Sequence, residues 1–365
     1  MKRCCYGWHK GTPMEYNKDY VNQVVELADF VAATWDPKMK WMWGEALLGY
    51  ALDELDKALG TENYTSFLTK YCDYWVKADP AVDQSDTAAP GLITYAMHKR
   101  TGNPAYKKLT DKVLHYIRHE PRLYLDCLNH LGSSGKGKLY PKSVWIDSVM
   151  MFSVFTSLYA RENGDEELLE FAARQPKQYA SMMFDPEDHL WAHSYWVDFK
   201  RPFPRRKLYW GRGNGWVVCG FPMILDQLGK DHPKAGEIIE IYQQTCEALL
   251  TCMAENGTFN TLLKYPSYQE LSATALISAG WMHGVRQGYL DEKFLEPAVG
   301  AFRACVEALE KTGDGVFMPQ ISGPTIPVPL LPKLGYQAVP LGKNWSYGIA
   351  ALIFAAIAYE KLFQK

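Results

Sequence analysis

The sequence predicts an all-α fold, an (α/α)6 barrel of six inner and six outer helices. Apolar residues recur at three- and four-residue spacing, and alternating β patterns are scarce. Helices end at a glycine, and the next begins on a polar cap or a proline, at intervals of roughly forty to sixty-five residues that suit a two-helix repeat. The helix before each glycine is more uniformly apolar and the one after it amphipathic, so the first should line the barrel and the second cover it.

Twelve helices are expected in chain order, at residues 17–34, 41–59, 62–78, 86–101, 103–119, 145–163, 165–183, 213–229, 232–254, 272–289, 291–311 and 343–362. The last inner helix should pack beside the first outer one and close the ring. That closure makes residues 1–365 one domain, although length alone would favour two. An open helical solenoid is the structural alternative.

The composition argues against several partners. A net charge of −2 over 365 residues, without long runs of one sign, gives no reason to expect nucleic acid or a membrane. Met1–Lys10 lacks the apolar core of a secretory signal, and the richest apolar window, Tyr347–Ala358, is too short to span a bilayer.

The eight cysteines, with one adjacent pair at Cys4-Cys5, form no CxxC motif, so we expect reduced thiols and a cytoplasmic protein. No HExxH or Cys/His cluster is present, so neither a metal nor another cofactor is expected.

The conspicuous polar and aromatic residues stand at the starts of the predicted inner helices. Because all inner helices point the same way, these starts should gather at one mouth of the barrel, where positive helix ends favour an anionic ligand. The residues placed there are Trp41, Trp43, Asp83, Asp86, Trp145, Asp147, Trp210, Arg212, Asn214, Trp216, Glu270, Ser272, Thr274, Asn344, Trp345 and Tyr347.

Three long connections should reach the same mouth. Glu120–Val144 contains His130, and Pro186–Tyr209 contains His193; Gly313–Leu341 is a third candidate rim. Loops of this length are uncommon and are usually functional or disordered.

The densest motif is Tyr209–Trp216, with three glycines, two tryptophans and Arg212. Arginine suits a carboxylate, and tryptophan faces can stack on a sugar ring. The glycines are expected to let the backbone approach a sugar closely. A glycine-rich turn leading into a buried helix explains the motif equally well. A P-loop does not, because its Lys-Ser/Thr end is missing.

Asp147 is the first candidate for chemistry. It lies between Trp145 and an apolar helix, so desolvation should raise its pKa and suit it to act as a general acid. Asp86 opens another inner helix, and the two carboxyls could form a glycosidase pair. Either aspartate could instead be an ordinary helix N-cap. Arg212 could form a surface ion pair, and His193 could be a packing residue, as could His130.

These residues resemble the unsaturated uronyl hydrolases of glycoside hydrolase families 105 and 88, most closely the family 105 branch. The matching stretches span most of the chain and are Asp86–Gly91, Tyr140–Asp147, His193, Trp210–Trp216 and Glu270–Ala275.

The resemblance implies an (α/α)6 barrel acting on oligosaccharides that end in a 4,5-unsaturated uronic acid, as in rhamnogalacturonan fragments from pectin. In such enzymes hydration of the C4=C5 bond gives a hemiketal that collapses and releases the sugar. Asp147 would protonate C4 and help to activate water, Asp86 would bind or orient, and Trp210 and Arg212 would hold the ring and its carboxylate, with His193 nearby. The expected substrate-binding set is Asp86, Trp43, His130, Trp145, His193, Trp210, Arg212, Asn214, Trp216 and Trp345. An inverting glycosidase using Asp86 and Asp147, and a non-catalytic protein that binds an anionic sugar, are the alternatives.

Overall fold

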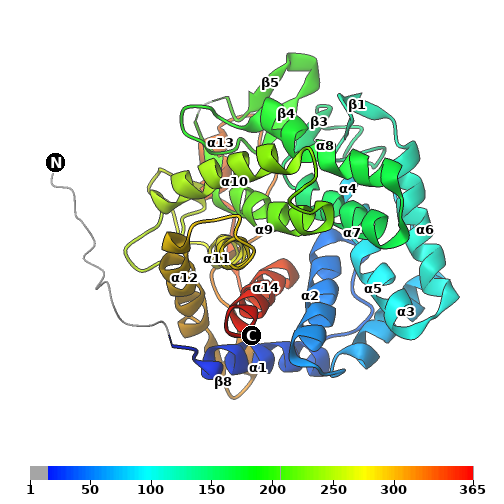
Figure 1. Cartoon of the computed structure of the whole chain (residues 1–365), viewed down its shortest axis with the longest axis vertical. Coiled ribbons are helices and arrows are strands. Elements are labelled where there is room, and N and C mark those ends of the chain that lie inside the picture. Colours follow the sequence, from blue (N-terminus) through cyan, green and yellow to red (C-terminus); the bar gives the residue numbers. More distant parts are fainter. Residues whose placement is uncertain (1–14, 206, 365) are drawn as a thin grey trace.

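The computed structural model describes residues 15–205 and 207–364, and its helices form a closed double ring (Figure 1). Each inner helix packs on the next, and the last packs on the first. The closed ring confirms the predicted (α/α)6 barrel over an open solenoid. The inner helices are α2 (Trp43–Leu59), α5 (Gly91–Thr101), α7 (Val154–Asn163), α9 (Gly211–Leu228), α11 (Leu271–Arg286) and α14 (Ser346–Phe363).

The outer ring covers these helices with amphipathic ones. As predicted, α1 packs against α14 and closes the structure. The outer helices are α1 (Lys18–Thr34), α3 (Thr65–Ala78), α6 (Pro104–His119), α8 (Glu166–Met183), α10 (Ala235–Leu250) and α12 (Leu295–Glu307).

Two predicted inner helices differ from expectation at their starts. The segment 86–101 is split into a short helix, α4 (Ser85–Ala88), and α5, because Pro90 interrupts the helical hydrogen bonding. The segment 145–163 begins as a strand and continues through a π-helical turn, η1 (Val149–Ser153), before α7. π-Helical turns are rare and often occur at functional sites.

Short strands within the long connections were not predicted. β3 (Ser143–Trp145), β4 (Ser194–Trp196) and β5 (Arg201–Phe203) form an antiparallel sheet. Four further pairs are β1 (Arg122–Tyr124) with β2 (Cys127–Leu128), β6 (Tyr209–Trp210) with β7 (Leu262–Leu263), β8 (Glu310–Thr312) with β9 (Gly315–Phe317), and β10 (Ile321–Ser322) with β11 (Leu341–Gly342). Strands of two or three residues are too short to show an alternating pattern.

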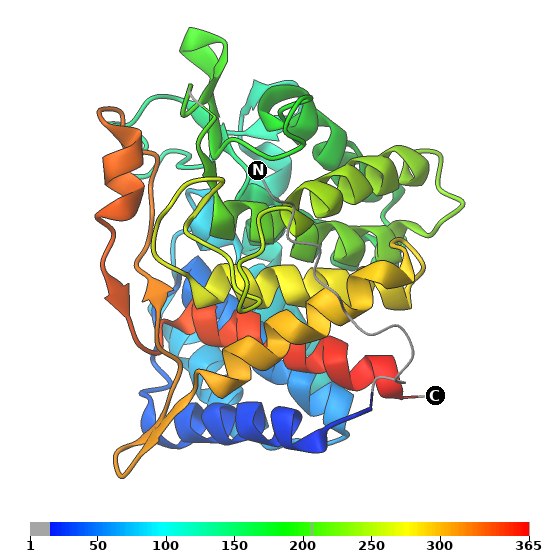
Figure 2. The same cartoon turned by 90° about the vertical axis from the view of Figure 1, so that its left-hand side faces the viewer.

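The two ends of the barrel are built differently (Figure 2). A short helix, α13 (Pro332–Gln337), lies at the end where the inner helices begin, and α14 finishes at the other end. Two short 3-10 turns, η2 (Val197–Phe199) and η3 (Glu292–Phe294), complete the described elements.

α14 is the apolar helix that the sequence singled out. Within the described residues it alone is long and apolar enough to cross a membrane, so the expected length was an underestimate. The structure buries 72% of its 18-residue window. Its apolarity therefore belongs to the barrel core. Met1–Lys10 and the Cys4-Cys5 pair lie outside the described residues. The six cysteines within them are free thiols: Cys72, Cys127, Cys219, Cys246, Cys252 and Cys305.

Candidate active site

The unpredicted β3–β4 pairing brings the two long connections together at the mouth of the barrel. Trp145 pairs with Ser194, and the Ile146 N–H donates to the His193 carbonyl over 3.1 Å. The residue after Ile146 is Asp147, so this register fixes Asp147 beside His193. The sequence placed both residues at the mouth, but the strand pairing makes them neighbours.

Asp147 and His193 form a buried pair. Nε2 of His193 lies 3.2 Å from Oδ2 of Asp147; the imidazole is fully buried and the carboxylate side chain is 12% exposed. Neither atom has a well-aligned hydrogen-bond partner among the described residues. Buried polar atoms without partners are rare and commonly mark sites that act on a ligand.

The electrostatics of this pair differ from the sequence expectation. Burial raises the pKa of Asp147, but the imidazoles of His193 and His130 lower it, and the net shift is downward. The predicted upward shift is therefore wrong for the free protein, because the sequence showed the desolvation and not the histidines. Burial lowers the pKa of His193, although Asp147 opposes this. The pair is thus a carboxylate facing a neutral imidazole at neutral pH.

A second aspartate–histidine pair stands next to the first. Nε2 of His130 lies 3.4 Å from Oδ1 of Asp86, and its Nδ1 is 3.0 Å from the Ser148 hydroxyl. The His130 backbone joins both neighbouring segments, accepting from the Ser85 N–H and donating to the Ser143 carbonyl. Asp86 and His130 therefore lie in the site, as the sequence predicted.

Neither aspartate is a helix N-cap, the alternative the sequence left open. Gln84 occupies the N-cap of α4, and Ser148 occupies that of η1. The carboxylates of Asp86 and Asp147 face the two histidines instead.

Tryptophan rings hold both histidines in place. His193 stacks on Trp210 with ring centroids 4.3 Å apart, and His130 stacks on Trp145 at 4.4 Å. Trp145 also meets His193 edge to face at 5.2 Å. These contacts fix the ring planes, so both imidazoles present defined nitrogens to the carboxylates.

Tyr336 is a site residue that the sequence did not identify. It is carried by α13, and its hydroxyl lies 2.9 Å from Nδ1 of His193. Its side chain is 1% exposed, and its backbone carbonyl accepts from the Tyr268 hydroxyl. The only sequence signal was the Pro- and Gly-rich rim at Gly313–Leu341, which does lie at this mouth.

Arg212 is differently engaged from the expectation. Its guanidinium is fully buried, and Nη1 and Nη2 donate to the carbonyls of Ser322 and Gly323 over 2.9 and 3.0 Å. Glu270 lies 3.7 Å away, and the Trp210 ring lies 4.8 Å below the guanidinium carbon. In this structure Arg212 is thus neither a surface ion pair nor open to a ligand carboxylate. It ties the end of β10 and the following Gly323 to α9 and supports Trp210.

The sequence profile of Glycosyl Hydrolase Family 88 matches residues 17–363. The chain belongs to glycosyl hydrolase family 88. It is therefore a glycoside hydrolase. The resemblance to families 105 and 88 that the motifs indicated is confirmed.

Several proteins resemble this family 88 hydrolase, two of them over nearly the whole chain and one over about half of it. The unsaturated rhamnogalacturonyl hydrolase YesR of Bacillus subtilis (strain 168) is 25% identical over 350 residues, covering 95% of this chain and 97% of the relative. An unsaturated 3S-rhamnoglycuronyl hydrolase of Alteromonas sp. (strain LOR) is 29% identical over 47% of this chain and 44% of its own. A crystal structure from Salmonella enterica serovar Paratyphi A, described as a possible GH105 member, has a TM-score of 0.85 at 20% identity and covers 97% of both chains.

Asn214 bonds with the backbone of Trp191 and Trp210, whereas the sequence suggested a role in substrate binding. It is fully buried, accepts from the Trp191 N–H, and donates to the carbonyls of Trp191 and Trp210. Both amide hydrogens are thus used within the protein. Asn214 fixes the approach of Trp210 to the site.

The glycines of the Tyr209–Trp216 motif face protein and not a ligand. A Cβ on Gly213 would lie 2.7 Å from the Trp210 ring and 2.8 Å from Ile146, and one on Gly211 would meet the Asn260 carbonyl. The expectation that they admit a sugar is wrong. They allow α9 to pack closely against its neighbours.

The other predicted aromatic residues line the neighbouring part of the mouth. Trp43 stacks on Tyr347 at 4.5 Å and meets Trp216 edge to face at 6.0 Å. Trp345 is 39% exposed, whereas Trp216 is 1% exposed. Trp43 and Trp345 are therefore better placed than Trp216 to offer a ring face to a sugar.

No cluster of three or more metal-binding side chains occurs within residues 15–205 and 207–364.

Proposed function

We propose that this hydrolase removes a 4,5-unsaturated uronic acid, of the galacturonyl type, from the non-reducing end of oligosaccharides generated by polysaccharide lyases. Family membership and the similarity, over nearly the full chain, to an unsaturated rhamnogalacturonyl hydrolase support this substrate class. The observation that carries the proposal is the buried Asp147–His193 pair, enclosed by Trp145 and Trp210.

The reaction begins at the C4=C5 bond of the unsaturated ring. Asp147 donates a proton to C4, and the ring oxygen stabilises the positive charge that develops at C5. The Asp147 carboxylate then accepts a proton from the water that attacks C5. The hemiketal at C5 opens, and the glycosidic bond breaks to release the sugar. One carboxyl group can perform both proton transfers because acid and base steps alternate.

Substrate binding can supply the protonated form of Asp147. The free carboxylate has a lowered pKa. A uronate placed beside it adds a second negative charge to a buried site, and a nearby like charge raises a carboxyl pKa.

The aromatic and helical surroundings fit a flat, anionic ring. A 4,5-unsaturated uronic acid has a flattened ring, which can stack on tryptophan. The N-termini of α9, α11 and α14 point toward this mouth, and helix N-termini favour anions.

One assay tests the proposal and separates it from its alternatives. The protein is incubated with unsaturated rhamnogalacturonan disaccharides, and the ultraviolet absorbance of the conjugated double bond is followed. Loss of absorbance with release of rhamnose is expected. Cleavage of saturated glycosides would favour a conventional inverting glycosidase using Asp86 and Asp147, and binding without turnover would favour a sugar-binding protein.

We further propose that the protein acts in the cytoplasm on fragments of pectin. The free thiols, including the buried Cys72, Cys219 and Cys246, support a compartment that keeps cysteine reduced. Subcellular fractionation of the native host tests this location, and recovery of the protein outside the cytoplasm would overturn it.

A further inference from the structure

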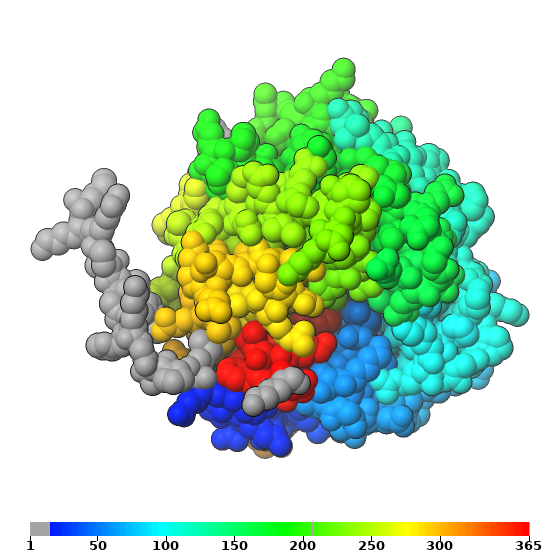
Figure 3. Space-filling model, viewed as in Figure 1, coloured from blue at the N-terminus to red at the C-terminus, as the bar shows by residue number. Residues whose placement is uncertain are grey.

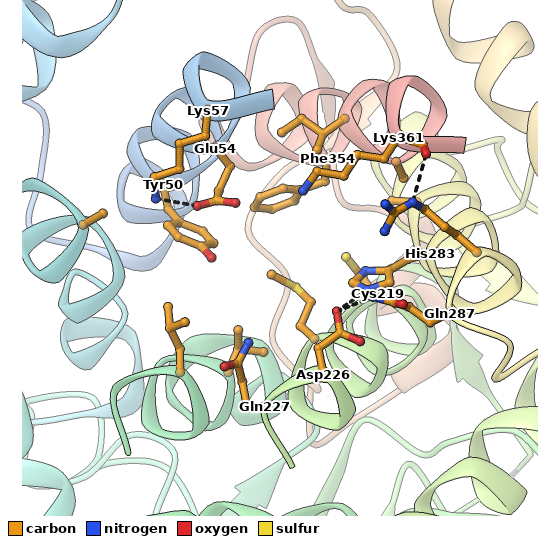
Figure 4. A pocket seen from close by; sticks show the side chains of 18 of the residues that line it. Tyr50, Glu54, Lys57, Cys219, Asp226, Gln227, His283, Gln287, Phe354 and Lys361 are labelled. Carbon is orange, nitrogen blue, oxygen red and sulfur yellow. Dashed lines mark hydrogen bonds and ion pairs between the residues drawn. The ribbon is translucent and has the colours of Figure 1, made fainter. Parts of the chain in front are cut away.

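A chamber lies at the opposite end of the barrel from Asp147. Its volume is about 460 Å³, and all six inner helices contribute to its wall near their C-terminal ends. The chamber opens on the face shown in Figure 3, as a recess around the end of α14. Figure 4 shows its polar side chains gathered around the barrel axis. Small-molecule sites in proteins have volumes of roughly 300–1,000 Å³.

This chamber is separate from the active site. Asp147 precedes η1 and α7, whereas Leu158 and Glu162 of the chamber lie in the last turns of α7. At 1.5 Å per helical residue, they stand roughly 16–23 Å from Asp147 along the axis. No residue of the site described above lines the chamber.

Small side chains on the barrel axis leave the space open. Ala96, Cys219, Ala279 and Ala358 each line the chamber from a different inner helix. Protein interiors are normally close-packed, and an unfilled volume lowers stability. A chamber kept open by four small residues is therefore a feature to explain.

The carboxylates of the chamber are already paired. Glu54 contacts Lys57 at 2.8 Å, Glu162 contacts Lys99 at 2.6 Å, and Asp226 contacts His283 at 2.7 Å. The pKa of Asp226 is lowered: burial raises it, but His283 and the hydrogen bonds from Tyr289 and Gln287 together outweigh that effect. Each of these three carboxylates therefore already has a partner in the protein.

The hydrogen-bond donors of the chamber, by contrast, outnumber the protein acceptors available to them. Arg286 donates only its Nε–H, to the Lys361 carbonyl over 2.9 Å. Within the described residues, no protein acceptor is found for the terminal nitrogens of Arg286, which is an exposed residue, or for the Nζ of Lys361, the Tyr50 hydroxyl and the Gln227 amide. Two cations and two neutral groups that line the chamber therefore have hydrogen-bond donors that no protein acceptor uses. Charge and donor inventory both favour an acceptor-rich anion.

One wall of the chamber is apolar. Tyr50 and Phe354 pack against each other with ring centroids 6.1 Å apart, and Met223 lines the chamber near them. Aromatic walls with a few polar groups suit a small ring that carries hydroxyls and a charge.

We propose that this chamber binds a small hydroxylated carboxylate of the sugar-acid class, with Arg286 and Lys361 holding its carboxylate and Tyr50 and Gln227 its hydroxyls. The site is independent of turnover at Asp147. It gives the enzyme a second place at which a sugar acid binds.

Isothermal titration with D-galacturonate as the probe tests this proposal. The double variant Arg286→Gln/Lys361→Gln removes both unpaired cations at the rim. The matched control, Lys107→Gln/Lys293→Gln, removes the same charge from exposed positions on α6 and η3. The chamber variant should bind at least about tenfold more weakly, as for loss of a charged hydrogen bond, and the control should bind like the parent. Tyr50→Phe should weaken binding by about threefold.

Two readouts assign the binding to the chamber. The chamber has no tryptophan in its wall, whereas the Asp147 site has several. Galacturonate bound in the chamber should therefore produce heat without quenching tryptophan fluorescence, and D-galactose should not compete. Absence of binding to the parent protein, or equal binding to the chamber and control variants, would overturn the proposal. Since binding is measured without turnover, failure of the proposed hydrolysis would not affect this result.

Discussion

The Tyr336 hydroxyl lies 2.9 Å from Nδ1 of His193, on the side of the imidazole opposite Asp147. Burial raises the pKa of Tyr336 well above its ordinary value, so its hydroxyl stays protonated and has a hydrogen to donate to Nδ1. When the hydroxyl donates, the hydrogen of the neutral imidazole sits on Nε2, facing the carboxylate. Tyr336, from the rim segment Gly313–Leu341, thus favours the His193 tautomer whose Nε2–H faces Asp147.

Tyr336→Phe should lower kcat/KM by about tenfold, because loss of this donor frees the imidazole to adopt the other tautomer. The pH profile should also change shape, which a purely structural role would not cause. Steady-state kinetics across pH, with the exposed Tyr74→Phe as control, provide the measurement. A profile identical to that of the parent would remove Tyr336 from the mechanism.

Asp147→Asn should lower kcat by about 10²–10⁴-fold, since an amide cannot transfer the proton to C4. The substitution preserves shape, so the thermal unfolding midpoint should change little. Asp111→Asn, on the surface of α6, is the matched control. Turnover near the parent rate in Asp147→Asn would refute the proposed mechanism.

The pH dependence of kcat/KM and kcat should differ. Catalysis begins with protonated Asp147, and the pKa of this group is lowered in the free enzyme, so kcat/KM should fall as pH rises above the acid range. The bound uronate raises the pKa in the complex, so the plateau of kcat should extend to higher pH. Coincident profiles would show that the substrate charge does not act on Asp147.

Arg212→Met should destabilise the protein by about 3–5 kcal/mol, because Glu270 would be left as an unpaired buried charge. Adding Glu270→Gln should recover part of this loss, since both charges are then absent. Urea unfolding of the two single variants and the double variant measures the coupling. Strictly additive effects would mean that the two groups do not stabilise each other.

The sequence predicted the barrel because its signals are local. Gly60, Gly102 and Gly164 end their helices with positive φ angles of 67°, 70° and 66°. The recurring glycines in the sequence predicted these helix ends. The more uniformly apolar helices form the inner ring, and the amphipathic helices form the outer ring. The site residues Asp86, Asp147, His130 and His193 were also found, because helix starts and long loops at one mouth can be read from order alone.

The contacts that complete the site could not be predicted, because they join residues far apart in the chain. The β3–β4 pairing that sets Asp147 beside His193 uses strands of three residues each. Arg212 bonds with a segment 110 residues away, and Tyr336 reaches His193 across 143. A single sequence carries no local signal for such contacts. The same limit explains why the pKa of Asp147 was expected to move in the wrong direction.

Gly213→Ala tests whether close packing of α9 supports the catalytic pair. Its Cβ would lie 2.7 Å from the Trp210 ring and 2.8 Å from Ile146, so one of them must move. Overpacking of this kind costs about 1–3 kcal/mol. Displacement of Trp210 would also disturb the ring on which His193 stacks, so kcat should fall together with stability.

Gly236→Ala is the control, because a Cβ there meets no atom within 4 Å. It lies in α10, where alanine is the better helix former, so stability should rise by up to about 1 kcal/mol. Thermal unfolding and kcat are measured for both variants. If Gly213→Ala lowered stability but left kcat unchanged, the position of Trp210 would not govern His193, and the stacking contact would serve packing alone.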